Sequence, residues 1–177
     1  MKMKVNDLRN GMIIKYLEKY LQVLSFKKTE EGLRVDTKNL QNDLHETITF
    51  QQEENIERVM LTNRDLEYSF LDGDVYNFMD IETYDPVTVK KEMLAPGFCY
   101  VRESDVCKGA YDEDDLIRIY PPYRVNRKIV SISTSKNGSM LLAKLDNDSQ
   151  IEVPSNCREG DTIVIDTASG IVLGISY

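Results

Sequence analysis

The feature that most constrains this chain is the strand-like alternation of its apolar residues. The clearest example is Leu66, Tyr68 and Phe70, then the turn signal Asp72-Gly73, then Tyr76 and Phe78. Residues two apart in a strand share one face, and an Asp-Gly pair between alternating runs is a strong signal for a β-hairpin with a type I′ turn. Long runs of helical i, i+3, i+4 spacing are absent from the sequence. The pattern therefore predicts a mainly β protein.

The first sixty residues predict a small barrel. Strands are expected at residues 12–16 and 20–26 around a turn at Glu18-Lys19, and at residues 47–50 after the turn signal Asn42-Asp43. Between them, Leu33, Val35 and Thr37 alternate on one face, and ERVMLT closes the set. Five or six short strands favour a closed barrel, because closure removes the exposed edges that invite aggregation.

Two further blocks follow. After the hairpin, residues 89–94 predict one or two helical turns before Pro96-Gly97, and strands are expected at residues 98–102 and 116–120. The last block holds five apolar runs, RKIVSIS, SMLLAKL, QIEVP, TIVID and IVLGISY, separated by turn formers such as Lys136-Asn137-Gly138. With a boundary at Pro121-Pro122, the predicted domains are residues 1–62, 63–122 and 123–177.

Composition excludes several classes of protein. The chain is 41% hydrophobic and 29% charged, which is typical of a folded globular protein. It has no run of about 20 apolar residues, and its start lacks the apolar core of a signal peptide, so we expect a cytoplasmic protein without a membrane partner. The net charge of −8 argues against a general nucleic-acid binder, but leaves open local basic contacts or a shape that mimics a nucleic acid.

Residues that could carry chemistry are sparse. Cys99, Cys107 and Cys157 are odd in number without C-x-x-C spacing, and His45 is the one histidine, so we expect neither a metal nor a cofactor. The patterns G-x-S-x-G, G-x-G-x-x-G and Walker A do not occur. The acidic run at residues 112–115 is interpreted as a solvated loop, and the alternating aromatics as core packing in preference to base stacking. An enzyme of unknown chemistry is the least supported hypothesis.

Longer motifs resemble the elongation factor P family. The run DGDVYNFMDIETYDP, at residues 72–86, is similar to the family's middle-domain pattern. The segments NDLRNGMIIKY and YLQVL resemble its opening, and EGDTIVIDTASGIVLG its closing strands, while IEVP falls where the family has V-x-V-P. The resemblance spans nearly the whole chain in the same order.

That resemblance implies both a fold and a function. The family has a KOW/SH3-like N-terminal barrel followed by two OB-like β-barrels, in an L-shaped arrangement that mimics tRNA. Its members bind the ribosome beside peptidyl-tRNA, relieve stalls at consecutive prolines by positioning the tRNA, and contribute no bond-breaking chemistry of their own. The implied partners are rRNA and the P-site tRNA, and the implied state is a monomer.

The family's first-domain loop is shortened here. Where the family has a glycine-rich loop with a modified lysine or an arginine at its tip, this chain has Thr29, Glu30, Glu31 and Gly32. The cations that flank this turn are Lys27, Lys28 and Arg34. Together these seven residues are the candidate contacts with ribosome and tRNA, and we expect no modification of Lys27 or Lys28 outside the glycine-rich setting.

Two hypotheses follow from the residues that match the family pattern and from those that depart from it. The first is an elongation factor P-like translation factor that promotes peptide-bond formation. The second is a degenerate paralogue that acts as a ribosome-associated or RNA- or protein-binding module without that stimulation. The acidic turn and the net charge favour the second, and the whole-chain resemblance favours the first.

Overall fold

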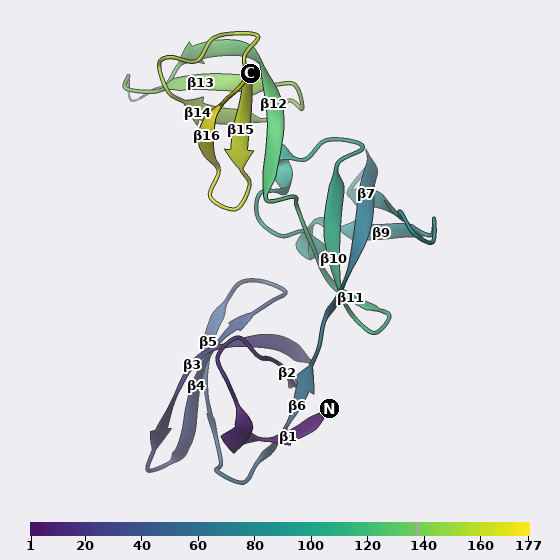
Figure 1. Ribbon diagram of the computed structural model, residues 1–177, viewed down its shortest axis with the longest axis vertical. Coiled ribbons are helices and arrows are strands. Elements are labelled where there is room, and N and C mark those ends of the chain that lie inside the picture. Colours follow the sequence, from purple (N-terminus) through teal and green to yellow (C-terminus); the bar gives the residue numbers. More distant parts are fainter. Residues whose placement is uncertain (137) are drawn as a thin grey trace. The chain divides into compact units, whose positions relative to one another are not determined.

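The computed structural model describes residues 1–136 and 138–177, and it confirms a mainly β protein (Figure 1). The strands are β1 (Lys2–Lys4), β2 (Ile13–Tyr16), β3 (Lys19–Thr29), β4 (Gly32–Asn39), β5 (His45–Phe50), β6 (Asn55–Val59), β7 (Thr62–Asp72), β8 (Val75–Asp80), β9 (Pro86–Lys90), β10 (Val106–Asp112), β11 (Asp115–Tyr120), β12 (Arg124–Thr134), β13 (Leu141–Leu145), β14 (Gln150–Val153), β15 (Thr162–Asp166) and β16 (Ile171–Ser176). Single 3₁₀ turns are η1 (Val5–Asp7), η2 (Lys91–Met93) and η3 (Phe98–Tyr100). The described residues contain no α-helix.

The strands form three curled sheets (Figure 1). Their orders are β1-β6-β2-β3-β4-β5, β11-β10-β7-β8-β9 and β14-β13-β12-β15-β16. Neighbouring strands pair antiparallel, as short connections allow. Three sheets in this order agree with the barrel-type fold expected from the resemblance.

The chain divides into two compact units. Unit 1 holds Met1–Arg64 and Gly109–Ile119, and unit 2 holds Asp65–Lys108 and Tyr120–Tyr177. The domain bounds 1–62, 63–122 and 123–177, and the L-shaped arrangement, stay predictions.

Unit 1 has a core on one face of its sheet. Leu33, Val35 and Thr37 are at most 2% exposed, which confirms the predicted alternation along β4. Leu33 and Val35 pack with buried residues that include Ile14 and Phe50. Burying one such side chain contributes about 1.5–3 kcal/mol, so the core fixes which face of β4 points outward.

The segment Gly109–Ile119 is anchored in unit 1 by polar contacts. Tyr20 donates to a carboxylate oxygen of Asp112 at 3.0 Å, and Arg64 donates to Asp114 at 3.0 Å. Arg118 is buried and donates to the carbonyl of Leu40 and to Asp43, each at 2.9 Å. The acidic run therefore forms the turn between β10 and β11. Glu113, Asp114 and Asp115 are exposed, which agrees with the interpretation as a solvated loop, and only Asp112 is half-buried.

Unit 2 contains the hairpin of β7 and β8, whose existence was predicted correctly. Its turn lies one residue later than expected, because Asp72 pairs with Val75, so the two turn residues are Gly73 and Asp74. Of these two, Gly73 has a positive φ, of 62°. A register shift between Tyr68 and Phe70 turns the Phe70 side chain away from the core, and this side chain is 51% exposed. The expectation that Phe70 packs inside was therefore wrong, since a bulge reverses the alternation beyond it.

The remaining elements also differ in one place from expectation. The strand expected at residues 98–102 is the 3₁₀ turn η3, because Gly97 at φ 92° turns the chain before it, and the sheet strand comes later as β10. The helical turn expected before Pro96 is η2. The five C-terminal runs are confirmed as β12 to β16. The turn signal Lys136-Asn137-Gly138 includes Asn137, which lies outside the described residues.

The structure also describes the cysteines and the features that a membrane-spanning or metal-binding protein would need. Cys107 and Cys157 are buried and Cys99 is exposed, all as free thiols. Within residues 1–136 and 138–177, no helix is long and apolar enough for a bilayer, and no three His, Cys, Asp or Glu side chains are grouped as metal ligands.

Candidate nucleic-acid interface

The candidate residues gather at the end of the β3–β4 hairpin in unit 1. Thr29 pairs with Gly32, so Glu30 and Glu31 are the two turn residues. The Thr29 hydroxyl donates to the carbonyl of Gly32 at 3.0 Å and ties the two strand ends together. The short turn inferred from the sequence is therefore a tight one that closes two long strands.

Gly32 makes this turn possible. Its φ is 139°, in the region that favours glycine, and a Cβ there would lie 2.2 Å from the carbonyl oxygen of Phe50 on β5. Phe50 is fully buried in the core, so its backbone has little room to move. Close approach of β4 and β5 at this point leaves space for glycine alone.

Two of the predicted cations face each other across the hairpin. Lys27 pairs with Arg34 in the register of β3 and β4, and both side chains are exposed. Because the neighbouring Leu33 and Val35 point into the core, Arg34 and its partner Lys27 point to solvent. Lys28 pairs with Leu33 and lies on the opposite face. The structure thus brings Lys27 and Arg34 together and separates Lys28 from them.

The solvent-facing rows of β3, β4 and β5 form a polar surface, here called the outer hairpin face. It consists of the row Lys27, Arg34 and Thr49 and the row Ser25, Asp36 and Thr47. Hydroxyl groups and cations both donate hydrogen bonds, and phosphate oxygens accept them. Lys27, Arg34 and Thr49 can therefore donate to a phosphate backbone, whereas the hydroxyls of Ser25 and Thr47 donate to Asp36.

The one carboxylate of the outer hairpin face is already bound. Thr47 donates to Asp36 at 2.7 Å and Ser25 donates to its other oxygen at 3.0 Å. These two hydrogen bonds, with a smaller contribution from Arg34, hold the pKa of Asp36 below its ordinary value. Asp36 consequently stays ionised but is not in an ion pair with Lys27 or Arg34.

The cations of the hairpin differ from other lysines of unit 1 in their ionic contacts. In the part of the chain that the structure describes, Lys27, Lys28 and Arg34 make no ion pair, whereas Lys19, Lys38 and Lys4 each pair with a carboxylate. Like charges directly opposite on neighbouring strands destabilise a sheet. A bound polyanion would relieve the repulsion between Lys27 and Arg34.

The turn itself is negative. Glu30, Glu31 and Gly32 line a shallow depression with residues 51–53, and Glu53 makes an exposed ion pair with Lys4 at 3.4 Å. The carboxylates of Glu30 and Glu31 therefore occupy the hairpin end, with the Lys27 and Arg34 pair behind them. The sequence predicts all these residues as one group of contacts and does not separate the two charges.

Sequence reasoning also missed the hydroxyl groups of the outer hairpin face. Ser25, Thr47 and Thr49 were not candidates, although the alternation Thr47, Ile48, Thr49 places both threonines on one face of a strand. Which residues lie beside them depends on the strand register, and the sequence alone does not specify that.

Comparisons with known proteins agree along the chain. A family model described as the elongation factor P (EF-P) OB domain matches residues 61–119. Elongation factor P of Zymomonas mobilis subsp. mobilis is 30% identical over 177 residues, covering 94% of each chain, and that of Lachnoclostridium phytofermentans is 27% identical over 174 residues, covering 93% of this chain and 94% of the relative.

A solved structure shows the same fold. Eukaryotic translation initiation factor 5A from Methanococcus jannaschii superposes with a TM-score of 0.50 at 14% identity, covering 67% of this chain and 95% of its own. At this identity the likeness concerns the fold alone.

Proposed function

Since this chain belongs to the elongation factor P family of translation factors, we propose that it binds the ribosome near peptidyl-tRNA and promotes peptide-bond formation. Its partners in this proposal are rRNA and the P-site tRNA, and it acts as a cytoplasmic monomer. Catalysis belongs to the ribosome, and the factor supplies positioning of the tRNA, which lowers the entropic part of the barrier.

The observation that carries the proposal is that Lys27 and Arg34 lie opposite each other on the outer hairpin face and make no ion pair within the described residues. RNA backbones are bound mainly through charge-assisted hydrogen bonds to phosphate, which arginine and lysine provide. Thr49 lies beside Arg34 in the next strand and adds a hydroxyl donor. We propose that Lys27 and Arg34 make the principal contacts, while Lys28, Thr29 and Gly32 shape the hairpin end.

The same geometry gives the turn a defined role. Glu30 and Glu31 repel phosphate, so the hairpin approaches RNA through its outer face rather than through its tip. No residue of the turn then needs a covalent modification. Intact-mass measurement of the protein from its native host should show unmodified Lys27 and Lys28, and a heavier peptide containing either lysine would contradict this.

The test of the proposed function is translation of a polyproline reporter in a reconstituted system that lacks elongation factor P. The wild-type chain should increase full-length product. The double substitution Lys27→Gln with Arg34→Gln should raise the concentration for half-maximal stimulation. Two exposed ionic contacts worth about 0.5–1 kcal/mol each correspond to a rise of roughly 5- to 30-fold.

A matched control removes the same charge elsewhere. Lys90 and Lys91 are exposed cations of unit 2 without an ion pair among the described residues. Lys90→Gln with Lys91→Gln should leave the stimulation unchanged. Equal losses from both double variants would contradict a specific role for the hairpin.

The second candidate function is a ribosome-associated or RNA- or protein-binding paralogue without stimulation of peptide-bond formation. The acidic turn of Glu30 and Glu31 favours it. It predicts that the wild-type chain fails to rescue the polyproline reporter. Ribosome pelleting then separates the two remaining cases, because a ribosome-associated paralogue sediments with ribosomes and a free module does not.

A further inference from the structure

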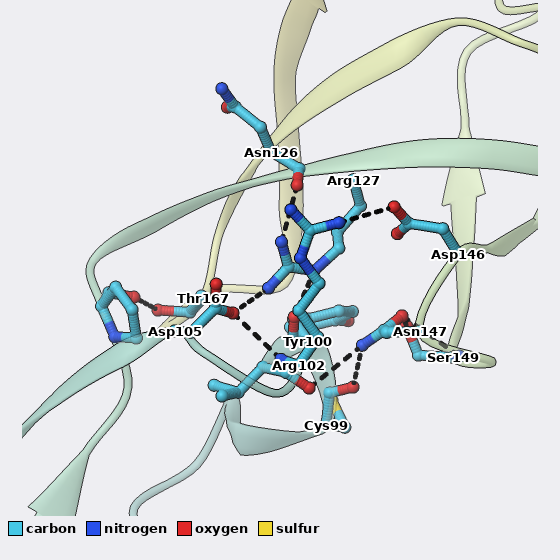
Figure 2. A network of polar contacts seen from close by, with 12 residues as sticks. Cys99, Tyr100, Arg102, Asp105, Asn126, Arg127, Asp146, Asn147, Ser149 and Thr167 are labelled. Carbon is cyan, nitrogen blue, oxygen red and sulfur yellow. Dashed lines mark hydrogen bonds and ion pairs between the residues drawn. The ribbon is translucent and has the colours of Figure 1, made fainter. Parts of the chain in front are cut away.

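A second polar cluster lies in unit 2, around a segment that belongs to no strand. We call residues 97–105 the strap. It contains η3 and runs from Gly97 to Asp105 before β10 begins. Figure 2 shows that its side chains and carbonyl groups meet residues from β12 and from the turn after β13. The strap therefore touches parts of the chain that come much later in the sequence.

One side of the strap is fastened to the β7–β8 hairpin. The ring of Phe98 packs edge-on against Tyr68 and Tyr76, with centroids 5.3 and 5.4 Å away. The backbone of Tyr68 donates to the carbonyl of Asp105 at 2.9 Å and accepts from the amide of Ser104 at 2.8 Å. These contacts make the strap a fixed part of that hairpin.

The other side of the strap is fastened by Arg127 on β12. Its side chain is 2% exposed, and its Nε donates to the carbonyl of Tyr100 at 2.7 Å. One terminal nitrogen donates to the carbonyl of Asn126 at 2.6 Å, and the other pairs with the carboxylate of Asp105 (Figure 2). All three guanidinium nitrogens thus have acceptors, in a fork geometry that lysine does not reproduce.

Asp105 is held in place for this pairing. The oxygen that binds Arg127 also accepts the backbone amide of Arg102 at 2.9 Å. Charges removed from water require such additional hydrogen bonds to be tolerated. Arg127 is therefore buried and Asp105 partly buried, and their ion pair is supported by these additional hydrogen bonds.

Three further contacts join the strap to the C-terminal sheet. Asn147, in the turn after β13, donates to the carbonyl of Cys99 at 2.9 Å. A Cβ on Gly97 would lie 2.1 Å from the carbonyl oxygen of Thr167, so the strap and the turn after β15 are in direct backbone contact. Arg102 adds an ion pair with Asp146 at 2.9 Å. The strap is thus attached at several separate points.

We propose that Arg127 is a positioning residue which, through the strap, holds the C-terminal sheet in one fixed orientation to the β7–β8 hairpin before any partner binds. Contacts on both sides of a nine-residue segment leave no hinge between the two parts. A surface that is already ordered loses less conformational freedom on binding. The proposal concerns unit 2 alone and goes beyond the proposed function.

The test measures distances between the two parts in the full chain. Nitroxide labels are placed at the exposed positions Asp74→Cys and Ser155→Cys, in a parent with Cys99→Ser, and distances are measured by double electron–electron resonance. The parent should give one narrow distribution. Arg127→Lys and, as a milder change, Asp105→Asn should each broaden it, while hydrogen exchange shows that both sheets stay folded.

The control variant is Lys144→Gln, which removes an exposed ion pair with Asp148 in the same sheet without touching the strap. Its distribution should remain narrow. A broad distribution in the parent, or variants of Arg127 and Asp105 as narrow as the parent, would overturn the proposal. In the polyproline assay, Arg127→Lys should raise the half-maximal concentration at unchanged maximal stimulation. This last readout rests on the proposed function, whereas the distance measurement does not.

Discussion

Replacing Gly32 by alanine should strongly destabilise the end of the β3–β4 hairpin. Alanine at a positive φ costs about 1–2 kcal/mol of backbone strain, partly offset by about 0.4–1 kcal/mol from the less flexible unfolded chain. The added Cβ, 2.2 Å from the carbonyl oxygen of Phe50, forces β4 and β5 apart, and such overpacking costs about 1–3 kcal/mol more. The expected total is about 2–4 kcal/mol.

Gly11 provides the matched control in the same unit. Its φ is 85°, but a Cβ there meets nothing within 4 Å, so Gly11→Ala carries the strain without the clash. The difference between the two variants should then be about 2 kcal/mol, mainly from the contact with Phe50. At 1.4 kcal/mol per factor of ten, this equals a roughly 30-fold difference in local opening.

The assay is amide hydrogen exchange followed by mass spectrometry of peptides from β4 and β5. Exchange reports local opening, which suits a chain of more than one unit better than a single melting temperature does. Gly32→Ala should speed exchange in these peptides about 30-fold more than Gly11→Ala does. Equal protection in the two variants would refute the argument that close approach to Phe50 requires glycine.

Three further predictions follow from charges and burial. Ribosome binding by Lys27→Gln with Arg34→Gln should depend less on salt, with the log-log slope flatter by about 1.4–1.8 for two lost phosphate contacts, and parallel slopes would exclude phosphate contact by this pair. Burial would raise the pKa of Asp43, but hydrogen bonds and charges of Lys38 and Arg118 outweigh it and lower the pKa. The stability that the ionised Asp43 contributes should therefore be fully present above about pH 4, the unfolded pKa, and should be lost as pH falls through the lower folded pKa. Urea titrations of wild type and Asp43→Asn should give unfolding free energies that converge in acid. A difference that stays constant with pH would contradict this. Burial, reinforced by Asp105, raises the pKa of Cys107 to about 12, so iodoacetamide at pH 8 should leave this thiol unmodified in the native protein and modify it in denaturant, whereas rapid native labelling would show that it is accessible.

Most of the strands could be predicted from the sequence because burial imposes a period of two. The C-terminal runs and the face of Leu33 and Val35 were identified in this way, since one side of each strand must leave water. The same assumption of strict alternation placed Phe70 on the wrong face. One inserted residue between Tyr68 and Phe70 reverses the alternation, and nothing local in the sequence marks a bulge.

The candidate site was predictable in part. The tight turn was inferred from the short distance between two alternating runs, and Lys27, Lys28 and Arg34 were named from their charge. That Lys27 faces Arg34 while Lys28 faces away depends on the pairing of Thr29 with Gly32. The role of Thr49 depends on a further strand pairing, whose hydrogen bonds are made by backbone groups common to all residues.

The strap was the largest omission, because its stability comes from distant residues. The run at residues 98–102 is apolar enough for a strand, but its carbonyl groups accept hydrogen bonds from the side chains of Arg127 and Asn147 instead of a neighbouring strand. Local patterns carry no information about partners so far along the chain.

These contacts between distant residues also set an order of events during synthesis. Asp105 leaves the ribosome 22 residues before Arg127, and Cys99 leaves 48 residues before Asn147. Until those partners emerge, a carboxylate and two carbonyl groups of the strap have only water to bind, and the β7–β8 hairpin lacks the support that its finished neighbour provides. We therefore expect unit 2 to complete folding only after its last strands have been translated, as one late and cooperative step.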